Sequence, residues 1–193
     1  MRSSAGSKSC KLGRVVGSVS LRTSRRRVAP LSEIDDQFIE VALAEAREAK
    51  SADEVPVGAC LVWNGRVIAR NHNRTQERGD PLAHAEMLVL EEAFRVLRTS
   101  RLTGVTLYCT LEPCFMCAGA LLHARVDRVV YSARDPKFGA CASLGTVLTD
   151  KRANHRALLS EGVGGEASRE LLRSFFRSKR AQTRRSEESD CSE

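Results

Sequence analysis

Two short stretches of the sequence carry residues whose types and spacing suit metal-dependent hydrolysis. The first reads H-A-E at residues 84–86, and the second reads P-C-F-M-C at residues 113–117. Histidine nitrogen and cysteine sulfur are ordinary ligands of tetrahedral zinc, and a site with three protein ligands leaves its fourth position for water. Zinc-bound water ionises near neutral pH, so such a site presents a hydroxide nucleophile. We therefore predict that His84, Cys114 and Cys117 bind zinc.

The spacing of these residues predicts where they lie on their helices. Cys114 and Cys117 are three residues apart, so on a helix they share a face. In the first turn, unpaired N–H groups and the helix dipole favour thiolates over thiols. His84 and Glu86 would point to different sides in mid-helix, so we infer that His84 stands at the start of its helix. Two thiolates balance the charge of zinc, which leaves Glu86 to carry protons from water to the substrate.

Other interpretations of these residues remain open at this point. A lone C-x-x-C pair is compatible with a redox centre or with half of a structural zinc site. A redox pair needs no histidine partner, whereas a structural site needs a fourth ligand, and His72, His123 and His155 are available. For His72 and His155 we expect surface or hydrogen-bonded positions instead of metal binding.

Local patterns predict the elements that position the site. Ser32 caps a helix that runs to about Lys50. Asn64-Gly65 joins two strand-like runs at residues 59–63 and 66–71, which is a strong hairpin signal because both turn positions need positive φ. Residues 72–83 are polar and turn-rich. Further helices are expected at residues 83–98, 113–124 and 165–179, the second with Pro113 at its first position, and further strands at 106–110, 128–132 and 157–160.

The apolar spacing of these segments predicts which helix faces are buried. In the first helix the residues expected to face the core are Ile34, Phe38, Val41 and Ala42. In the second helix the expected apolar stripe consists of Met87, Leu90, Phe94 and Leu97. Strands and helices that alternate after an opening hairpin indicate one α/β domain, a mixed sheet flanked by helices.

Composition and charge narrow the class of protein. The chain has 193 residues, of which 42% are hydrophobic and 28% charged, as in a folded domain. No apolar run approaches the roughly 20 residues that span a bilayer, so no membrane association is expected. Residues 1–32 hold eight of the 31 basic side chains and no acid, which leaves 23 basic against 24 acidic side chains in residues 33–193. The folded part is therefore not a broadly basic nucleic-acid binder.

The chain divides into three parts by composition. We expect a basic disordered arm at residues 1–32, a zinc-dependent domain at 33–180 and a charged disordered tail at 181–193. Two alternatives to such an arm are an organelle transit peptide and residues upstream of the true start. Cys60 and Cys109 lie in apolar runs, as buried free cysteines do. A thiolate–zinc site and an odd number of cysteines favour a reducing compartment, and so a cytoplasmic protein.

Beyond the zinc residues, the sequence resembles the bacterial tRNA-specific adenosine deaminase family of the cytidine deaminase-like superfamily. The similar stretches cover about residues 33–180 and consist of V-P-V-G-A-C-L-V-W-N-G-R-V-I-A-R-N from Val55, D-P-L-A-H-A-E-M from Asp80, T-L-E-P-C-F-M-C-A-G-A-L from Thr110, R-V-V-Y-S-A-R-D-P-K-F-G-A from Arg128, N-H-R from Asn154 and L-L-R-S-F-F-R from Leu171. The zinc residues fit the whole superfamily, whereas A-R-D-P-K and the terminal F-F-R favour the tRNA enzyme.

The resemblance implies a fold, a reaction and partners. The fold would be a single-domain, three-layer α/β/α cytidine deaminase-like fold with a mixed five-stranded sheet. The reaction would be zinc-hydroxide hydrolytic deamination of the wobble adenosine (A34) of a tRNA anticodon to inosine, usually in an arginine tRNA. The enzyme would be a homodimer with one Zn²⁺ per subunit.

The resemblance also implies roles for individual residues. Glu86 would carry protons, and Asn73 and Val57 would line the pocket of the flipped adenosine. The residues expected along the anticodon loop are Asp135, Lys137, Asn154 and Phe176. Phe138 stands where related enzymes often carry a smaller residue, and the basic arm is a second departure from the compact bacterial form.

From the residues alone, several of these positions also suit structural roles. Asn73 is equally suited to a turn, and Phe175 and Phe176 to core or dimer contacts. Arg169, Arg173, Arg177 and Arg180 recur on one side of the last helix, as in a phosphate-binding stripe or a solvated helix. Rival functions are a deaminase of a free nucleobase, nucleoside or nucleotide, and a non-catalytic tRNA-binding module stabilised by zinc.

Overall fold

The computed structural model describes residues 31–190, which form a five-stranded mixed sheet covered on both faces by helices. The strands lie in the order β2-β1-β3-β4-β5, where β1 pairs antiparallel with β2 and β3, and β3-β4 and β4-β5 pair parallel. Their bounds are β1 Gly58–Trp63, β2 Arg66–His72, β3 Val105–Leu111, β4 Arg128–Ala133 and β5 Leu158–Glu161. The predicted mixed five-stranded sheet is confirmed.

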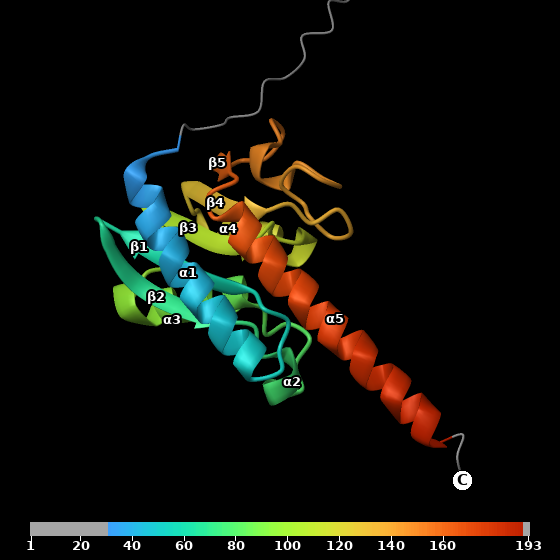
Figure 1. Cartoon of the computed structure of the whole chain (residues 1–193). Coiled ribbons are helices and arrows are strands. Elements are labelled where there is room, and N and C mark those ends of the chain that lie inside the picture. The colour runs from blue at the N-terminus through green and yellow to red at the C-terminus, as the bar shows by residue number, and fades with distance from the viewer. Residues whose placement is uncertain (1–30, 191–193) are drawn as a thin grey trace, which may run out of the picture.

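The helices form one layer on each side of this sheet. In chain order they are α1 Glu33–Ser51, α2 Thr75–Arg78, α3 Ala85–Leu97, α4 Phe115–Ala124, the 3₁₀ helix η1 Val147–Thr149 and α5 Gly165–Asp190. In Figure 1, α1 and α5 lie side by side in front of the sheet, while α3 and α4 lie behind it. Each face has its own apolar core, so the predicted three-layer α/β/α arrangement is confirmed. Among the residues described, no helix combines the length and apolarity needed to cross a membrane.

The first helix begins where the sequence predicts, and three of its four predicted core positions face the core: Ala42 is buried, and Phe38 and Val41 pack against the core. Ser32 is the N-cap of α1, and its backbone N–H donates to the Asp35 carboxylate over 2.9 Å. Asp35 is fully buried, because Arg128 and the Tyr108 hydroxyl also donate to it over 2.8 Å. The helix turns this aspartate inward, so Ile34 is 47% exposed and its predicted core position is wrong.

The hairpin turn has the geometry that its sequence requires. Asn64 and Gly65 both adopt positive φ, at 49° and 72°, between β1 and β2. Asparagine tolerates this left-handed region better than other side chains do, and glycine has no Cβ to clash there. The predicted Asn-Gly hairpin is confirmed, with one irregularity in register between Leu61 and Val62.

Three element boundaries differ from the prediction. The polar segment 72–83 contains a short helix, α2. Cys114 is the N-cap of α4, so Pro113 lies before the helix instead of at its first position. Helix α5 continues past Lys179 to Asp190 and projects beyond the body of the domain (Figure 1). Residues 181–190 of the tail expected to be disordered are helical in the structure, and they contain no glycine or proline to stop the helix.

Helix α3 is buried over a wider face than the predicted stripe. Leu90 is buried, as expected, but the other three predicted positions are only half-buried: Met87, Phe94 and Leu97. Val89 and Ala93 are fully buried, because α3 packs against β1, β2 and β3 and also against α4.

Of the arm predicted at residues 1–32, residues 1–30 lie outside the part of the chain that the structure describes.

Candidate active site

Two helix N-termini meet behind the sheet, and each is capped by a residue that can bind metal. His84 is the N-cap of α3 and Cys114 is the N-cap of α4, both with extended backbone. Cys117 lies in the first turn of α4 and is buried. Neither cap side chain bonds its own helix, so both remain available to another group. The inferred position of His84 at the start of its helix is confirmed.

These three residues fit a zinc ion. The Nδ1 atom of His84 lies 3.8 Å from Cys114 Sγ and 3.6 Å from Cys117 Sγ, and the ligand atoms of the three residues all lie within 4.8 Å of one another. In a tetrahedral site with Zn–S of about 2.3 Å and Zn–N of about 2.05 Å, nitrogen and sulfur ligands are about 3.6 Å apart. Among the residues described, no fourth histidine, cysteine or acid joins the group, so one position stays open.

The electrostatics of this cluster favour thiolate character at Cys114. The neighbouring Cys117 and the His84 imidazole lower the pKa of the Cys114 thiol to about 4. The adjacent Cys114 and burial raise the pKa of Cys117, so without metal the pair holds a proton on Cys117. A zinc ion would displace this proton, since metal-bound cysteine is a thiolate.

Glu86 stands two residues after His84 and is almost completely buried. It lies in the first turn of α3, with 3% of its surface exposed, and it lines the same pocket as His84 and Cys114. Burial raises the pKa of its carboxyl group. A carboxyl whose pKa is shifted toward neutrality can both accept and donate a proton, as a general acid–base requires.

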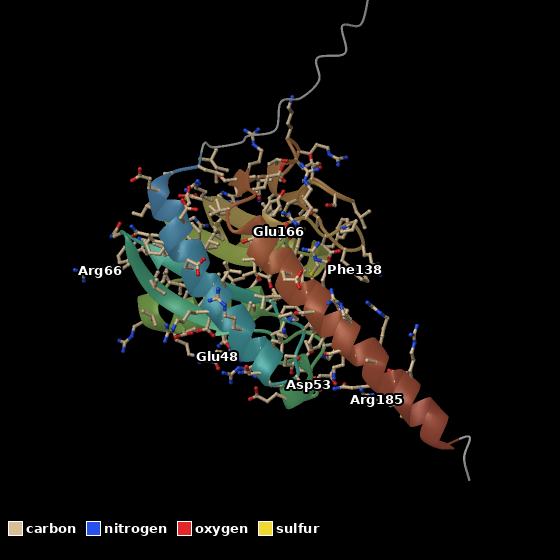
Figure 2. The ribbon with its side chains drawn as sticks, in the orientation of Figure 1. Glu48, Asp53, Arg66, Phe138, Glu166 and Arg185 are labelled. Atoms are coloured by element: carbon tan, nitrogen blue, oxygen red, sulfur yellow. The ribbon has the colours of Figure 1, made fainter. Side chains whose placement is uncertain are left out.

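The cluster opens into a pocket of about 730 Å³, within the ordinary range of small-molecule sites. Six residues predicted from the sequence line it besides His84 and Cys114: Val57, Asn73, Glu86, Asp135, Lys137 and Phe176. Phe138 lines it as well, at the rim near α5 (Figure 2). Cys117 lies behind this lining, and Asn154 is absent from it.

Asn73 connects one wall of the pocket to the zinc-ligand helix. Its backbone N–H donates to the Val57 carbonyl over 3.0 Å, and its side-chain Oδ1 accepts the Ala85 N–H over 2.8 Å. The second bond satisfies an N–H group in the first turn of α3, which has no partner within the helix. Asn73 therefore has a structural role at α3 as well as a place in the pocket.

Asn154 lies away from the pocket lining. Its side-chain oxygen accepts a hydrogen bond from Arg125 over 2.9 Å. Two of the three other histidines considered as ligands have local partners: His72 Nδ1 lies 2.9 Å from a Glu45 oxygen, and His155 Nε2 lies 2.8 Å from the Val126 carbonyl. The expectation that His72 and His155 are hydrogen-bonded residues is confirmed.

The two adjacent phenylalanines of α5 have different environments. Phe175 is buried, whereas Phe176 is 45% exposed and lines the pocket together with Leu172, one turn earlier. Arg169 and Arg173 are paired with Glu166. The first two arginines of the predicted stripe are therefore paired with acids of the same helix. Within the described residues, no ion pair involves Arg177 or Arg180.

Several residues that line the pocket were not predicted from the sequence. Glu112, Arg134 and Leu172 line the pocket without having been predicted. Glu112 is the residue next to Pro113 at the end of β3, and an acid at the end of a buried strand is a signal that could have marked it.

A three-layer α/β/α domain whose His-Cys-Cys cluster lies beside a buried glutamate is the arrangement expected of a hydrolytic zinc deaminase. The family model of MafB19-like deaminases matches residues 34–180. A solved structure from a study of guanine deaminase from Nitrosomonas europaea superposes with a TM-score of 0.64 at 25% identity, covering 78% of this chain and 87% of that one. The fold is the cytidine deaminase-like α/β fold, as expected.

Sequence relatives narrow this class. The tRNA-specific adenosine deaminase of Bacillus subtilis (strain 168) is 48% identical over 143 residues, which are 74% of this chain and 89% of that protein. A structure from a study of A-to-I editing by tRNA A34 deaminases at the wobble position is 47% identical, with a TM-score of 0.68, and covers 70% of this chain and 99% of that one. The chain belongs to the tRNA-specific adenosine deaminases, within the MafB19-like deaminase family.

Proposed function

We propose that this protein hydrolyses the 6-amino group of the wobble adenosine (A34) in a tRNA anticodon and leaves inosine. The proposal rests above all on the 48% identity to a tRNA-specific adenosine deaminase over most of that protein's length. It agrees with a pocket that brings a buried carboxyl group next to a candidate metal site and is large enough to admit a nucleoside. A base in a duplex could not reach this pocket, so the adenosine must be extruded from its stack in a single-stranded loop.

The chemistry needs a metal ion, and the residues present fit zinc. His84, Cys114 and Cys117 would hold one ion per subunit. When bound, zinc acts as a Lewis acid that lowers the pKa of a water molecule in its open position.

Glu86 would do the proton work of the reaction. The attacking water loses a proton to the Glu86 carboxylate, and its oxygen forms a bond to C6 of adenine. Glu86 passes this proton to N1 of the ring, then takes the second proton from the new C6 hydroxyl and delivers it to the departing amino group, so the C6–N bond breaks and ammonia leaves. Adenosine and water are thereby converted to inosine and ammonia. Burial raises the pKa of Glu86, and this suits the exchange because the carboxylate then accepts a proton more readily.

The rest of the pocket would hold the base and its neighbours. Val57 and Asn73 would wall the adenine, with Asn73 already positioned by the start of α3. Asp135, Lys137 and Phe176 would contact the flanking nucleotides, since they line the outer part of the pocket on the loop after β4 and on α5. Asn154 lies outside the pocket lining, so it would contact the anticodon loop only if the RNA also reaches the surface beside Arg125.

A free purine base is the rival substrate. The structural likeness to a guanine deaminase favours it, since that protein is named for action on a purine base. The higher identity to the tRNA enzymes and the exposed Phe176 at the pocket wall weigh toward RNA.

We further propose a homodimer that acts in the cytoplasm, with an arginine tRNA among its substrates. Exposed apolar side chains at the start of α4 and in the nearby loop, Phe115 at 50% and Leu144 at 57% exposure, are suited to contact a second copy. Sedimentation of the purified chain would test the dimer directly.

The decisive experiment maps the product on the RNA. Zinc-loaded protein is incubated with an arginine tRNA transcript that carries A at position 34, and with a matched transcript that carries G34. Mass spectrometry of nuclease fragments should find inosine at position 34 of the first transcript and no change in the second. Conversion of free guanine or adenosine without conversion of the transcript would replace this proposal with the rival one.

A further inference from the structure

One buried carboxylate organises a whole wall of the pocket. Glu112 is 2% exposed and follows β3 directly. Its Oε1 accepts the backbone N–H groups of Cys141, Ala142 and Ser143 over 2.9, 2.6 and 2.9 Å. Its Oε2 accepts the backbone N–H of Asp135 over 3.1 Å and the Ser143 hydroxyl. Although burial acts against it, these donors hold the pKa of Glu112 below its ordinary value.

All of these donors belong to the segment at residues 134–143, called the pocket loop below. Its first half contributes five consecutive residues to the pocket lining: Arg134, Asp135, Pro136, Lys137 and Phe138. The Asp135 carboxylate folds the loop locally, since its Oδ1 accepts the N–H groups of Lys137 and Phe138 over 2.9 and 3.3 Å. The loop thus closes on itself at Asp135 and is attached to the domain by Glu112.

The space around the carboxylate shows how closely the loop is held. A Cβ added to Gly139 would lie 2.4 Å from Glu112 Oε2 and 2.6 Å from the Asp135 carbonyl oxygen. Contacts this short are not tolerated, so the loop approaches Glu112 only because residue 139 has no side chain.

The same loop also touches the turn that presents the metal ligand. The Ala140 N–H donates to the Pro113 carbonyl over 2.9 Å, and Cys114 forms an isolated antiparallel bridge with Gly139. Glu112, Pro113 and Cys114 are consecutive. Each of them contacts the pocket loop, and the last of them is also a candidate metal ligand. The distance between the metal site and the outer pocket is therefore set through Glu112.

We propose that Glu112 is a positioning residue for this active site, which holds the pocket loop in register with the metal-ligand turn so that Asp135, Lys137 and Phe138 face the substrate. This inference rests on the proposed function for its kinetic effect, but its structural part stands without it. Both carboxylate oxygens of Glu112 are engaged by donors of the pocket loop, so we assign it no direct part in the reaction. Its effect should therefore fall on substrate binding, and only weakly on the chemical step.

A second buried carboxylate, Glu54, also holds a segment that lines the pocket, but this segment contributes fewer residues to the lining. Glu54 is 1% exposed and accepts the N–H groups of Gln76 and Glu77 over 2.7 and 2.9 Å and the Thr75 hydroxyl over 2.9 Å. It therefore holds α2, of which only Thr75 lines the pocket. Glu112 holds a loop that contributes five lining residues, so its loss should affect binding more.

The test variant is Glu112→Gln, which keeps the shape of the side chain. An amide offers one oxygen where the carboxylate offers two, so at least one backbone N–H of the pocket loop loses its acceptor. The matched control is Asp35→Asn, another buried carboxylate with several donors, which lies in α1 and does not line the pocket. Both variants are measured for zinc content, Tm, and kcat and KM on an A34 anticodon stem-loop.

We expect Glu112→Gln to keep its zinc and raise KM about tenfold, with kcat reduced much less, because one charge-assisted hydrogen bond is worth about that factor. Asp35→Asn should lower Tm at unchanged KM. An unchanged KM in Glu112→Gln, an equal rise of KM in both variants, or loss of zinc from Glu112→Gln would each overturn the positioning role.

Hydrogen exchange gives a readout that does not depend on the substrate. The amides of Asp135, Cys141, Ala142 and Ser143 should exchange faster in Glu112→Gln than in the wild type, while amides of β1 should not change. If the loop loosens but neither protein acts on the stem-loop, the structural inference holds and the proposed function fails. If these amides remain protected, the inference itself is wrong.

Discussion

The two halves of the pocket are built in different ways. The half that would do the chemistry lies on the first turns of α3 and α4, where His84, Glu86, Cys114 and Cys117 are placed by regular helices. The half that would face the rest of the substrate lies on the pocket loop and on α5, where Lys137, Phe138 and Phe176 are partly or largely exposed. Helix N-termini give fixed geometry for a reaction, whereas exposed segments give a surface that can follow a larger partner.

This difference predicts separable effects of mutation. Changes in the chemical half should abolish turnover or metal binding and leave RNA binding intact. Changes in the outer half should weaken RNA binding and leave the metal in place.

The largest effect is expected for Glu86→Ala. Loss of a general acid–base lowers turnover by about a hundredfold to ten-thousandfold, while zinc content and the Kd for a tRNA transcript should stay at the wild-type values. Metal analysis, filter binding and single-turnover assays of one preparation measure all three. If the variant loses zinc together with activity, Glu86 supports the metal site instead of carrying protons.

The next effect concerns the metal itself. Cys114→Ser should lower zinc occupancy after dialysis and lower Tm, because the thiolate that binds zinc is replaced by a poorer ligand and a stabilising ion is lost. Cys60→Ala is the control, since Cys60 is a buried free cysteine in the core on the α1 face of the sheet. Full zinc occupancy in Cys114→Ser would mean that another residue is the ligand.

The smallest of these effects is expected in the outer half. Phe176→Ala should weaken binding of an anticodon stem-loop by about 1–3 kcal/mol, the range for a base stacked on an aromatic ring, with zinc content unchanged. The neighbouring Phe175 is buried, so Phe175→Leu should lower Tm and leave the Kd unchanged. Equal losses of affinity in both variants would show that Phe176 acts through folding and not through contact with RNA.

The sequence predicts the local structure of the chemical half, because the information for it is local. The two-residue spacing of His84 and Glu86 already requires a helix start, and Cys114 and Cys117 have the spacing of a shared helix face. The Asn64-Gly65 turn is equally local, and the strand pairing around it follows from the hairpin.

The outer half could not be predicted in the same way, because it depends on contacts between distant residues. The donors to Glu112 come from residues 135–143, more than twenty positions away, and nothing near Glu112 in sequence indicates them. Ile34 fits an apolar helical pattern, but the bonds from Arg128 and Tyr108 turn Asp35 inward and leave Ile34 exposed. Asn154 matches the family sequence, yet its side chain bonds Arg125 and does not line the pocket.

One comparison of substrates tests most directly whether both halves act together on tRNA. Zinc-loaded protein is given an A34 anticodon stem-loop, a linear RNA of the same loop sequence and free adenosine, and kcat/KM is measured from inosine formation. We predict the highest kcat/KM for the stem-loop, a much lower value for the linear RNA and no measurable turnover of adenosine. A kcat/KM for free adenosine equal to that for the stem-loop would contradict this prediction, because the outer half would then contribute nothing to the reaction.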